Sequence, residues 1–413
     1  MKHTVTLDDQ SYIIERKEEI IEEIDLIALL QQQSLYPKFY WKGRGSEEMI
    51  IAIGSCLRLD HVPGSILADP NIRFYGGLSF LENTIPSTLW KEFPATYFFL
   101  PCIEVIQTPS STRLITYALF ENPLPNYQNI SSEDTNPEPY VCKRTDLPTN
   151  SQWLDLIGKA LKKIKDKDLQ KVVLARMSTF ETTGIISPYL FLKTLQNQSV
   201  HTTVFLFMPK QDSTFLGSTP EKLYTRQNRD LQTEALAGTT VRGATPFEDA
   251  EHQKKLLQSS KDIREVQAVE SFLTSTCQMI SDKIDWQGQY RIIQTAKVQH
   301  LYKQLCCILK ESINDKILLE CLHPTPALAG LMQEMALSFI QEHEPFDRGW
   351  YGGCIGWISQ DAADFAVSIR SALVSKNKIH LFAGTGIVEG SDPEKEWDEL
   401  DHKISQFGAL LHE

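Results

Sequence analysis

The feature of this sequence that most constrains its fold is a series of short runs rich in β-branched and aromatic residues, each bounded by turn residues, after residue 150. The runs are KVVLA, TTVFLFM, TFLGS, KLYTR, GGCIGWIS, DFAVSI and KIHLFAG. One long helical pattern lies between them, from Glu248 to about Met279. Its apolar face consists of Leu256, Ile263, Val266, Val269 and Phe272. Strand runs that mostly follow one another predict an α+β fold rather than βαβ repeats.

Two features organise the first part of the chain. Ile20, Ile24 and Ile27 recur at helical spacing with acids between them, which predicts an amphipathic helix from about residue 16 to 32. The stretch 121–150 is rich in proline, asparagine, serine and aspartate, which predicts a long connection. We expect this connection to separate the N-terminal third from the remainder.

Composition excludes several classes of partner. The formal net charge is −12, and Lys and Arg are scattered among acids, which argues against binding to nucleic acid or anionic lipid. No stretch reaches the roughly 18 apolar residues of a membrane span, and the start turns charged before a signal-peptide core could form. We therefore expect a cytoplasmic protein without a membrane partner. The eight cysteines form no C-x-x-C pair, which predicts reduced structural thiols.

Carboxylates at helical spacing are the candidate metal ligands. Asp262 and Glu265 are three residues apart on one predicted helix. Glu396 and Glu399 have the same spacing on another. Such oxygen ligands suit Mg²⁺, which also takes water and substrate oxygens, although pairs with this spacing are, taken alone, usually solvated helix faces. No nucleotide motif competes, because residues 384–390 contain one residue too many for G-x-G-x-x-G.

Ten ordered blocks of this sequence, over roughly residues 150–413, resemble the chorismate-utilising enzyme family, which includes isochorismate, salicylate, anthranilate and aminodeoxychorismate synthases. The blocks are KVVLAR, GSTPEKL, EALAGTTVRG, KDIREVQAV, VQHL, LHPTPALAG, FDRGWYGGCIGW, FAVSIRSALV, LFAGTGIVEGSDPEKEW and DELDHK. The resemblance implies a two-layer α/β sandwich with large antiparallel sheets flanked by helices. It also implies that residues 151–413 are the chorismate-binding catalytic domain, and that residues 1–120 are a variable part of the same fold unit.

The resemblance implies a Mg²⁺ site. In that family, glutamates that match Glu265 and Glu399 hold the metal, and the positions of Asp262 and Glu396 act through water. It further implies that the substrate chorismate is bound by Gly238, Thr239, His300, Ala327, Leu328, Tyr351, Arg370, Gly384 and Lys403. Plainer explanations exist for several of these: His300 could be a structural histidine, Arg370 could pair with an acid, and the glycines could serve turns.

The resemblance also assigns Lys171 as general base and Glu221 as general acid. Lys171 opens a predicted strand; if it stood alone, it would be read as a surface lysine at a strand edge. As a base it must lose its proton, whereas Glu221 must hold its proton near neutral pH, which burial or a neighbouring carboxylate can arrange. Lys171 would activate a water that adds at C2 of chorismate, while Glu221 protonates the hydroxyl that leaves C4.

Four features favour an isochorismate synthase among the family members. Enzymes that use ammonia normally have glutamine at the position of Lys171. Aminodeoxychorismate synthases often carry a lysine at the position of Ala237 in the run Ala235-Leu236-Ala237-Gly238-Thr239. Salicylate synthases usually have threonine at the position of Ala327. The ending EWDELDHK resembles the quinone-pathway enzymes, which favours menaquinone biosynthesis. Val266 departs from the family pattern, which often has histidine there.

Alternatives remain open at this point. The chain could be a salicylate synthase or an isochorismate synthase of a siderophore pathway. A non-catalytic chorismate-binding protein is an alternative of another class, for which loss of Lys171, Glu221 or a metal glutamate would be the expected sign. We expect a monomer or a weak homo-oligomer.

Overall fold

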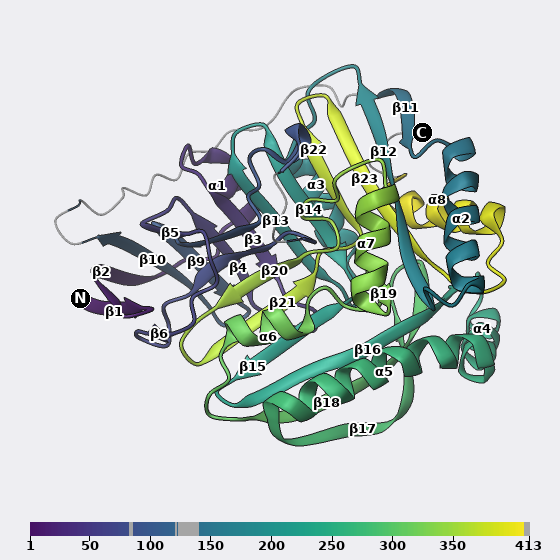
Figure 1. The fold of residues 1–413 in the computed structure, drawn as a ribbon. Helices are drawn as coiled ribbons and strands as arrows, with labels where there is room; N and C mark the ends of the chain where they lie inside the picture. The colour runs from purple at the N-terminus through teal and green to yellow at the C-terminus, as the bar shows by residue number, and fades with distance from the viewer. Residues whose placement is uncertain (82–85, 120–121, 123–139, 409–413) are drawn as a thin grey trace.

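Two large antiparallel sheets form the frame of the molecule (Figure 1). The computed structural model describes residues 1–81, 86–119, 122 and 140–408. Within these residues, fourteen strands form the larger sheet and nine the smaller. All strand pairs described are antiparallel.

The larger sheet has the order β11 (Val141–Leu147), β12 (Lys171–Thr182), β23 (Lys378–Ile387), β22 (Ser371–Ser375), β14 (Ser213–Thr219), β13 (Thr203–Lys210), β3 (Lys38–Lys42), β4 (Met49–Ile53), β9 (Ile103–Thr108), β10 (Ser111–Leu119), β2 (Gln10–Ile21), β1 (Lys2–Leu7) and β6 (Ile66–Leu67), with β19 (Gly330–Leu331) paired to β12. The smaller sheet has the order β17 (Ser281–Gln294), β18 (Val298–Leu309), β16 (Asp230–Val241), β15 (Lys222–Gln227), β21 (Ala362–Val367), β20 (Cys354–Ile358), β7 (Phe74–Leu78), β8 (Thr96–Leu100) and β5 (Leu57–Leu59). Strands from before residue 120 thus lie in both sheets beside strands from after residue 150.

Aromatic side chains fill the space between the two sheets. Phe39 of β3 contacts Tyr75 of β7, with ring centroids 5.2 Å apart. Phe207 of β13 contacts Tyr97 of β8 at 5.1 Å and Trp350 at 5.0 Å. All five rings are buried, and contacts of this kind add to the burial of apolar area. The main core therefore lies between the sheets.

Helices cover the sheets, and all of those described except α7 (Gln333–His343) begin at a residue whose side chain caps the first turn. They are α1 (Leu26–Gln32), α2 (Asn150–Lys165), α3 (Pro188–Gln198), α4 (Pro246–Gln258), α5 (Ser260–Ile280), α6 (Asp315–Leu322), α7 (Gln333–His343) and α8 (Pro393–Ile404), with short 3₁₀ turns at Thr88–Trp90 and Ser405–Phe407. Figure 1 shows α5 along β16 and β18, α7 over β12, and α8 beside α2. At the start of α8, Asp392 accepts hydrogen bonds from two backbone N–H groups and Pro393 takes the first position.

The predicted α+β class and the predicted sheet architecture flanked by helices are confirmed. Each of the seven strand runs coincides with a strand of the structure: β12, β13, β14, β15, β20, β21 and β23. The helix that was predicted to carry Glu396 and Glu399 is α8.

The predicted helix from residue 16 to 32 is wrong in its first part. Residues up to Ile21 belong to β2, which lies between β1 and β10, and only α1 is helical. Ile20 is 80% exposed and therefore does not belong to a core-facing stripe. Asp25 fixes the start of α1, because its side chain accepts hydrogen bonds from the N–H groups of Ile27 and Ala28.

The long helical pattern from Glu248 to Met279 is two helices, α4 and α5. The chain is extended at Ser259, which ends α4 and caps α5 by accepting a hydrogen bond from the Asp262 N–H. Apolar periodicity continues across this break, so the pattern alone could not reveal it. Val266 and Val269 are buried as predicted.

The expected connection at 121–150 lies mostly outside the described residues. Within it, the structure describes Val141–Leu147 as strand β11, which pairs with β12, and α2 begins at Asn150.

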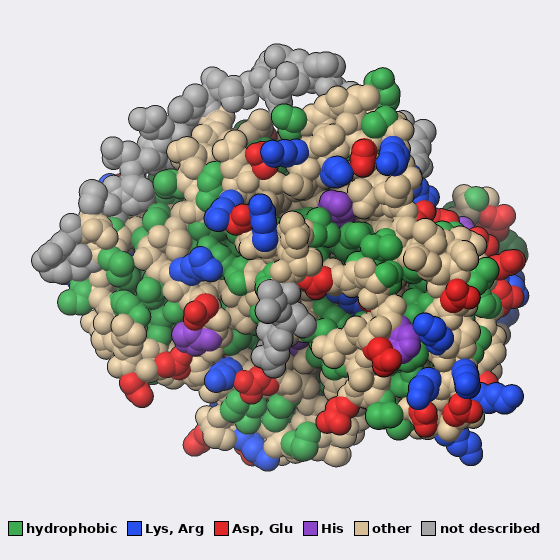
Figure 2. Space-filling view, turned by 45° about the horizontal axis from the view of Figure 1, so that its top comes forward, with side chains coloured by type: hydrophobic (Ala, Val, Ile, Leu, Met, Phe, Trp, Pro, Cys, Tyr) green, Lys and Arg blue, Asp and Glu red, His purple; other side chains and the backbone are tan. Residues whose placement is uncertain are grey.

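None of the helices described is both long enough and apolar enough to cross a lipid bilayer. Acidic and basic side chains are interspersed on the face shown in Figure 2 and do not form a patch of one sign there.

Candidate functional site

Lys171 is a buried lysine at the start of β12, with 7% of its surface exposed. Its Nζ donates a hydrogen bond to Glu265 Oε1 on α5 at 3.0 Å. The side chain passes over Gly386 of β23, where an added Cβ would lie 2.5 Å from Lys171 Cε. Lys171 is therefore not a surface lysine at a strand edge, and its course across β23 depends on the glycine.

Glu221 lies where the chain crosses from the larger sheet to the smaller one, between β14 and β15. The residue is half-buried, and Thr325 Oγ1 lies 3.5 Å from its Oε1. Burial, followed by the negative charge of Glu234, raises the pKa of the Glu221 carboxyl to about 8. Thr325, Lys171 and Arg44 act in the opposite direction. Glu221 thus holds its proton at neutral pH, as a general acid requires.

The two predicted carboxylate pairs lie on α5 and α8. On α8, the hydroxyl of Thr385 donates to both Glu396 and Glu399 Oε1, the latter at 3.3 Å, so that pair does share one helix face. The pKa of Glu399 is lowered, and the positive charge of Lys261 on α5 contributes to this, so the two helices interact electrostatically. Burial opposes that lowering, and Lys403 is the largest charge that favours it.

The glutamates fit a divalent cation by their chemistry. Glu265 and Glu399 each form an ion pair with a lysine: Lys171 pairs with Glu265 at 3.0 Å, and Lys403 pairs with Glu399 at 2.5 Å. Their side chains remain 36% and 49% exposed and so are accessible to an ion and water. Carboxylate oxygens are ligands that Mg²⁺ prefers. Within the described part of the chain, no three His, Cys, Asp or Glu side chains lie close enough to hold a metal by themselves, so water or substrate oxygens would have to complete the shell.

Gly238, Thr239 and His300 lie together on the neighbouring strands β16 and β18. Gly238 has a φ of +71° at a break in the strand register, and a Cβ there would lie 2.8 Å from Asp262 Cβ. Glycine thereby lets α5 approach β16. Thr239 Oγ1 and His300 Nδ1 are hydrogen-bonded at 3.0 Å. Burial and the positive charges of Arg370 and Lys403 lower the pKa of His300 to about 3, which keeps the imidazole neutral.

Gly384, Tyr351 and Lys403 also meet at one place. Lys403 Nζ donates to the Gly384 carbonyl at 2.7 Å. A Cβ at Gly384 would lie 2.9 Å from the Tyr351 hydroxyl, so the strand and the tyrosine approach closely because the residue is glycine. Arg370 has a left-handed backbone with a φ of 49°, and its charge acts on both Tyr351 and His300. Arg370 and Lys403 therefore bring two positive charges to this group of residues, and the negative charge of Glu399 acts on both of them.

Ala327 and Leu328 lie in the turn that follows α6. The Leu328 N–H donates to the Thr325 carbonyl at 2.9 Å, in the same turn whose threonine hydroxyl lies near Glu221. The Leu328 carbonyl accepts a hydrogen bond from Arg348 at 3.0 Å. The turn is thus fixed on one side to Glu221 and on the other to Arg348.

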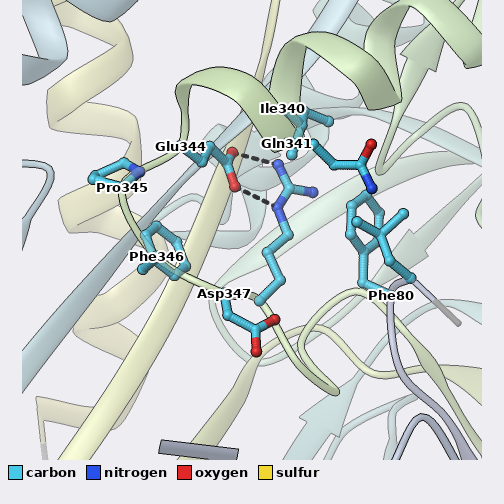
Figure 3. Close-up of a pocket in the computed structure, with 9 residues that line it drawn as sticks. Phe80, Ile340, Gln341, Glu344, Pro345, Phe346 and Asp347 are labelled. Carbon is cyan, nitrogen blue, oxygen red and sulfur yellow. Dashed lines mark hydrogen bonds and ion pairs between the residues drawn. The ribbon is translucent and has the colours of Figure 1, made fainter. Parts of the chain in front are cut away.

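Arg348 and Glu344 form a buried ion pair beside a separate cavity of about 460 Å³ (Figure 3). Arg348 Nη2 also donates to the Val173 carbonyl at 2.7 Å, and Glu344 Oε1 accepts from the Ala175 N–H at 2.8 Å. None of the predicted site residues lines this cavity. The pair supports β12 just beyond Lys171.

Five residues at the site escaped the sequence analysis. They are Arg44, Glu234, Thr325, Thr385 and Gly386. Thr325, Thr385 and Gly386 stand inside blocks quoted above, so their neighbours in sequence were a signal. Glu234 also opens a quoted block, EALAGTTVRG, but Arg44 lies 190 positions away, and nothing in the local pattern connects the two.

Comparisons with known proteins agree on one family. Residues 62–412 match the family described as chorismate binding enzyme. The isochorismate synthase MenF of Haemophilus influenzae is 31% identical over 95% of this chain and 90% of its own length. The chloroplastic isochorismate synthase 2 of Arabidopsis thaliana is 35% identical over 83% of this chain, which spans 65% of that protein. A solved structure of MenF, described as the menaquinone-specific isochorismate synthase from Escherichia coli, has a TM-score of 0.86 at 27% identity and covers 100% of this chain and 96% of that one.

Proposed function

This chain belongs to the family of chorismate binding enzymes, and from that premise we propose that it is an isochorismate synthase, an isomerase that converts chorismate into isochorismate. The observation that carries the proposal is the combination of a buried lysine, Lys171, with a carboxyl at Glu221 whose pKa is raised to about 8. Addition of water needs a base, and loss of a hydroxyl group needs an acid. These two side chains supply both.

In the proposed reaction, Lys171 removes a proton from a water molecule as the water oxygen bonds to C2 of chorismate. The ring double bonds shift, and the bond from C4 to its hydroxyl breaks. Glu221 gives its proton to that hydroxyl, which leaves as water, so one water enters and one departs. Lys171 must first give up a proton, because a protonated amine has no lone pair to act as base; the neutral amine can still donate a hydrogen bond to Glu265.

Glu265 and Glu399 would hold Mg²⁺ directly, with Asp262 and Glu396 acting through water. The ion would bind the ring carboxylate of chorismate and offset its charge. Thr385, which donates to both glutamates of α8, would fix the orientation of their carboxylates.

The second carboxylate of chorismate would be bound by Arg370, Tyr351, the N–H of Gly384 and Lys403. A planar guanidinium suits a carboxylate, and the lysine adds a second positive charge. The remaining predicted substrate positions, Gly238, Thr239, His300, Ala327 and Leu328, would line the rest of the site. The neutral state of His300 makes it a hydrogen-bonding group rather than a charge.

We further propose that the product serves menaquinone biosynthesis. The ending EWDELDHK and the similarity to proteins named MenF support this. Ala327, where salicylate synthases usually have threonine, supports release of isochorismate without elimination of pyruvate. Lys171, where ammonia-using members have glutamine, supports water as the nucleophile.

The test is incubation of the purified protein with chorismate, with and without Mg²⁺ and with ammonium offered, followed by chromatographic separation of the products. Metal-dependent formation of isochorismate alone is expected. Salicylate with pyruvate would overturn the argument from Ala327, and an aminated product would overturn the argument from Lys171. Chorismate binding without turnover would favour a non-catalytic binding protein.

A further inference from the structure

A buried ion pair joins the two sheets next to Glu221. Arg44 lies in the hairpin between β3 and β4 of the larger sheet, and Glu234 lies in β16 of the smaller sheet. The guanidinium donates to both carboxylate oxygens of Glu234, to Oε1 at 2.8 Å. Their side chains are 11% and 3% exposed, so the pair is largely removed from water. A buried ion pair is weak evidence for a stabilising role, so its location next to Glu221 calls for another explanation.

The same pair holds the backbone on both sides of Glu221. Arg44 Nη1 donates to the carbonyl of Pro220, the residue before it. Glu234 Oε1 accepts a hydrogen bond from the N–H of Lys222, the residue after it, at 3.0 Å. Glu221 itself lies between two strands, where its N–H donates to Thr219 Oγ1 at 3.2 Å and its carbonyl accepts from the Val367 N–H at 3.1 Å. The ion pair adds one backbone contact on each side of the residue.

Other titratable and polar groups face Glu221 from three further directions. Besides Glu234 and Arg44, they are Lys171 at the start of β12, Tyr351, and the hydroxyl of Thr325 in the turn after α6. Among these, Glu234 is the strongest influence that favours the protonated acid, and Arg44 opposes it. The pair thus combines one charge of each sign close to the same carboxyl.

We propose that Arg44 and Glu234 are positioning residues for Glu221: they hold its backbone at the crossing between the sheets and balance the charge around its carboxyl. This inference rests on the proposed role of Glu221 as general acid. Neither residue is assigned contact with chorismate.

Opposite shifts of the pH profile test the proposal. In Glu234→Gln, the remaining positive charge of Arg44 favours ionised Glu221, so the alkaline limb of kcat moves to lower pH by roughly one unit. In Arg44→Gln, the remaining Glu234 carboxylate favours the proton, and the limb moves to higher pH, with a lower kcat because the Pro220 contact is lost. Arg44→Lys keeps the charge and returns the limb toward its original position. A purely structural pair would lower activity without moving the limb in opposite directions.

Asp315→Asn is the matched control. Asp315 forms a comparable buried pair with Arg226 in the smaller sheet, with side chains 5% and 8% exposed, and neither residue contacts Glu221. This variant should lose stability and keep the wild-type pH profile. A similar shift of the limb in the control would overturn the proposal.

A second readout separates failure of this proposal from failure of the proposed function. Titration of ¹³C-labelled glutamate carboxyls, with Glu221 assigned by its absence in Glu221→Gln, measures the proton on Glu221 without any turnover. Opposite displacements in the Glu234→Gln and Arg44→Gln proteins are expected even if another reaction is catalysed. An unchanged titration of Glu221 in both folded variants would overturn the proposal.

Discussion

At the scale of single residues, two glycines shape the surroundings of Lys171. A Cβ at Gly330 would lie 2.1 Å from the Lys171 carbonyl, and a Cβ at Gly386 would lie 2.5 Å from Lys171 Cε. The sequence predicted Lys171 and Glu221 through their blocks, because each has a recognisable neighbourhood. It could not predict the glycines as their supports, because these come from other strands and the contact exists only in the folded chain.

Gly386→Ala should lower kcat at least tenfold while the protein stays folded. The new methyl group meets the flexible end of Lys171, so the lysine moves rather than the backbone. Steady-state kinetics with circular dichroism would check this. Gly158→Ala is the control, because it lies in α2 with open space around it, and alanine there should stabilise the helix by about 0.5–1 kcal/mol without loss of activity. Unchanged kcat in Gly386→Ala would contradict the account.

Activity should fall as pH rises through about 8, where Glu221 loses its proton. The pKa of this acid is raised, so the active protonated form persists at neutral pH and disappears above that value. The pH dependence of kcat checks this, and Glu221→Gln should lower kcat by a factor of about 10² to 10⁴. An alkaline limb that survives in Glu221→Gln would show that another group controls it.

At the scale of elements, local patterns predicted the strands well because each run carries its own alternation and turn residues. The prediction of a helix at residues 16–21 was wrong because this part of β2 pairs with β10, about 100 residues away, and tertiary structure sets that pairing. The break at Ser259 was missed because the apolar face of α4 continues into α5. Caps were the better local signal, as Ser259 and Asp392 both begin helices that carry candidate metal ligands.

Ser259→Ala should destabilise the protein by about 1 kcal/mol and raise the Mg²⁺ concentration needed for half-maximal activity. The hydroxyl of Ser259 accepts from the Asp262 N–H, so its loss loosens the turn that bears Asp262 and precedes Glu265. Thermal unfolding and a Mg²⁺ titration measure the two effects. Ser271→Ala in the exposed middle of the same helix should change neither by much. If Ser259→Ala lowered the unfolding temperature and left the Mg²⁺ requirement as in wild type, the link would fail.

At the scale of the whole molecule, the site depends on strands from both parts of the chain. Strand β3 pairs with β13, and β7 pairs with β20, so the sheets around the catalytic residues include N-terminal strands. Arg44 extends that dependence to the surroundings of Glu221. Composition predicted a connection at residues 121–150, because composition describes local segments and carries no information on which strands become neighbours.

A fragment of residues 151–413 should therefore not fold by itself. It would expose the edges of β13 and β20 and a large part of the aromatic layer between the sheets. Expression of this fragment, alone and together with residues 1–122, tests the prediction by solubility and circular dichroism. Rescue by the second fragment is expected, whereas a folded and active fragment alone would show that the N-terminal strands are dispensable.

The most direct test of the central claim is the fate of oxygen when the purified protein converts chorismate in H₂¹⁸O. If Lys171 activates a solvent water and Glu221 protonates the departing hydroxyl, each isochorismate molecule carries one ¹⁸O, at the C2 hydroxyl, as mass spectrometry and ¹³C isotope shifts would show. Isochorismate without label at C2 would mean that the hydroxyl moves within the substrate, and this would contradict the assigned roles of both residues.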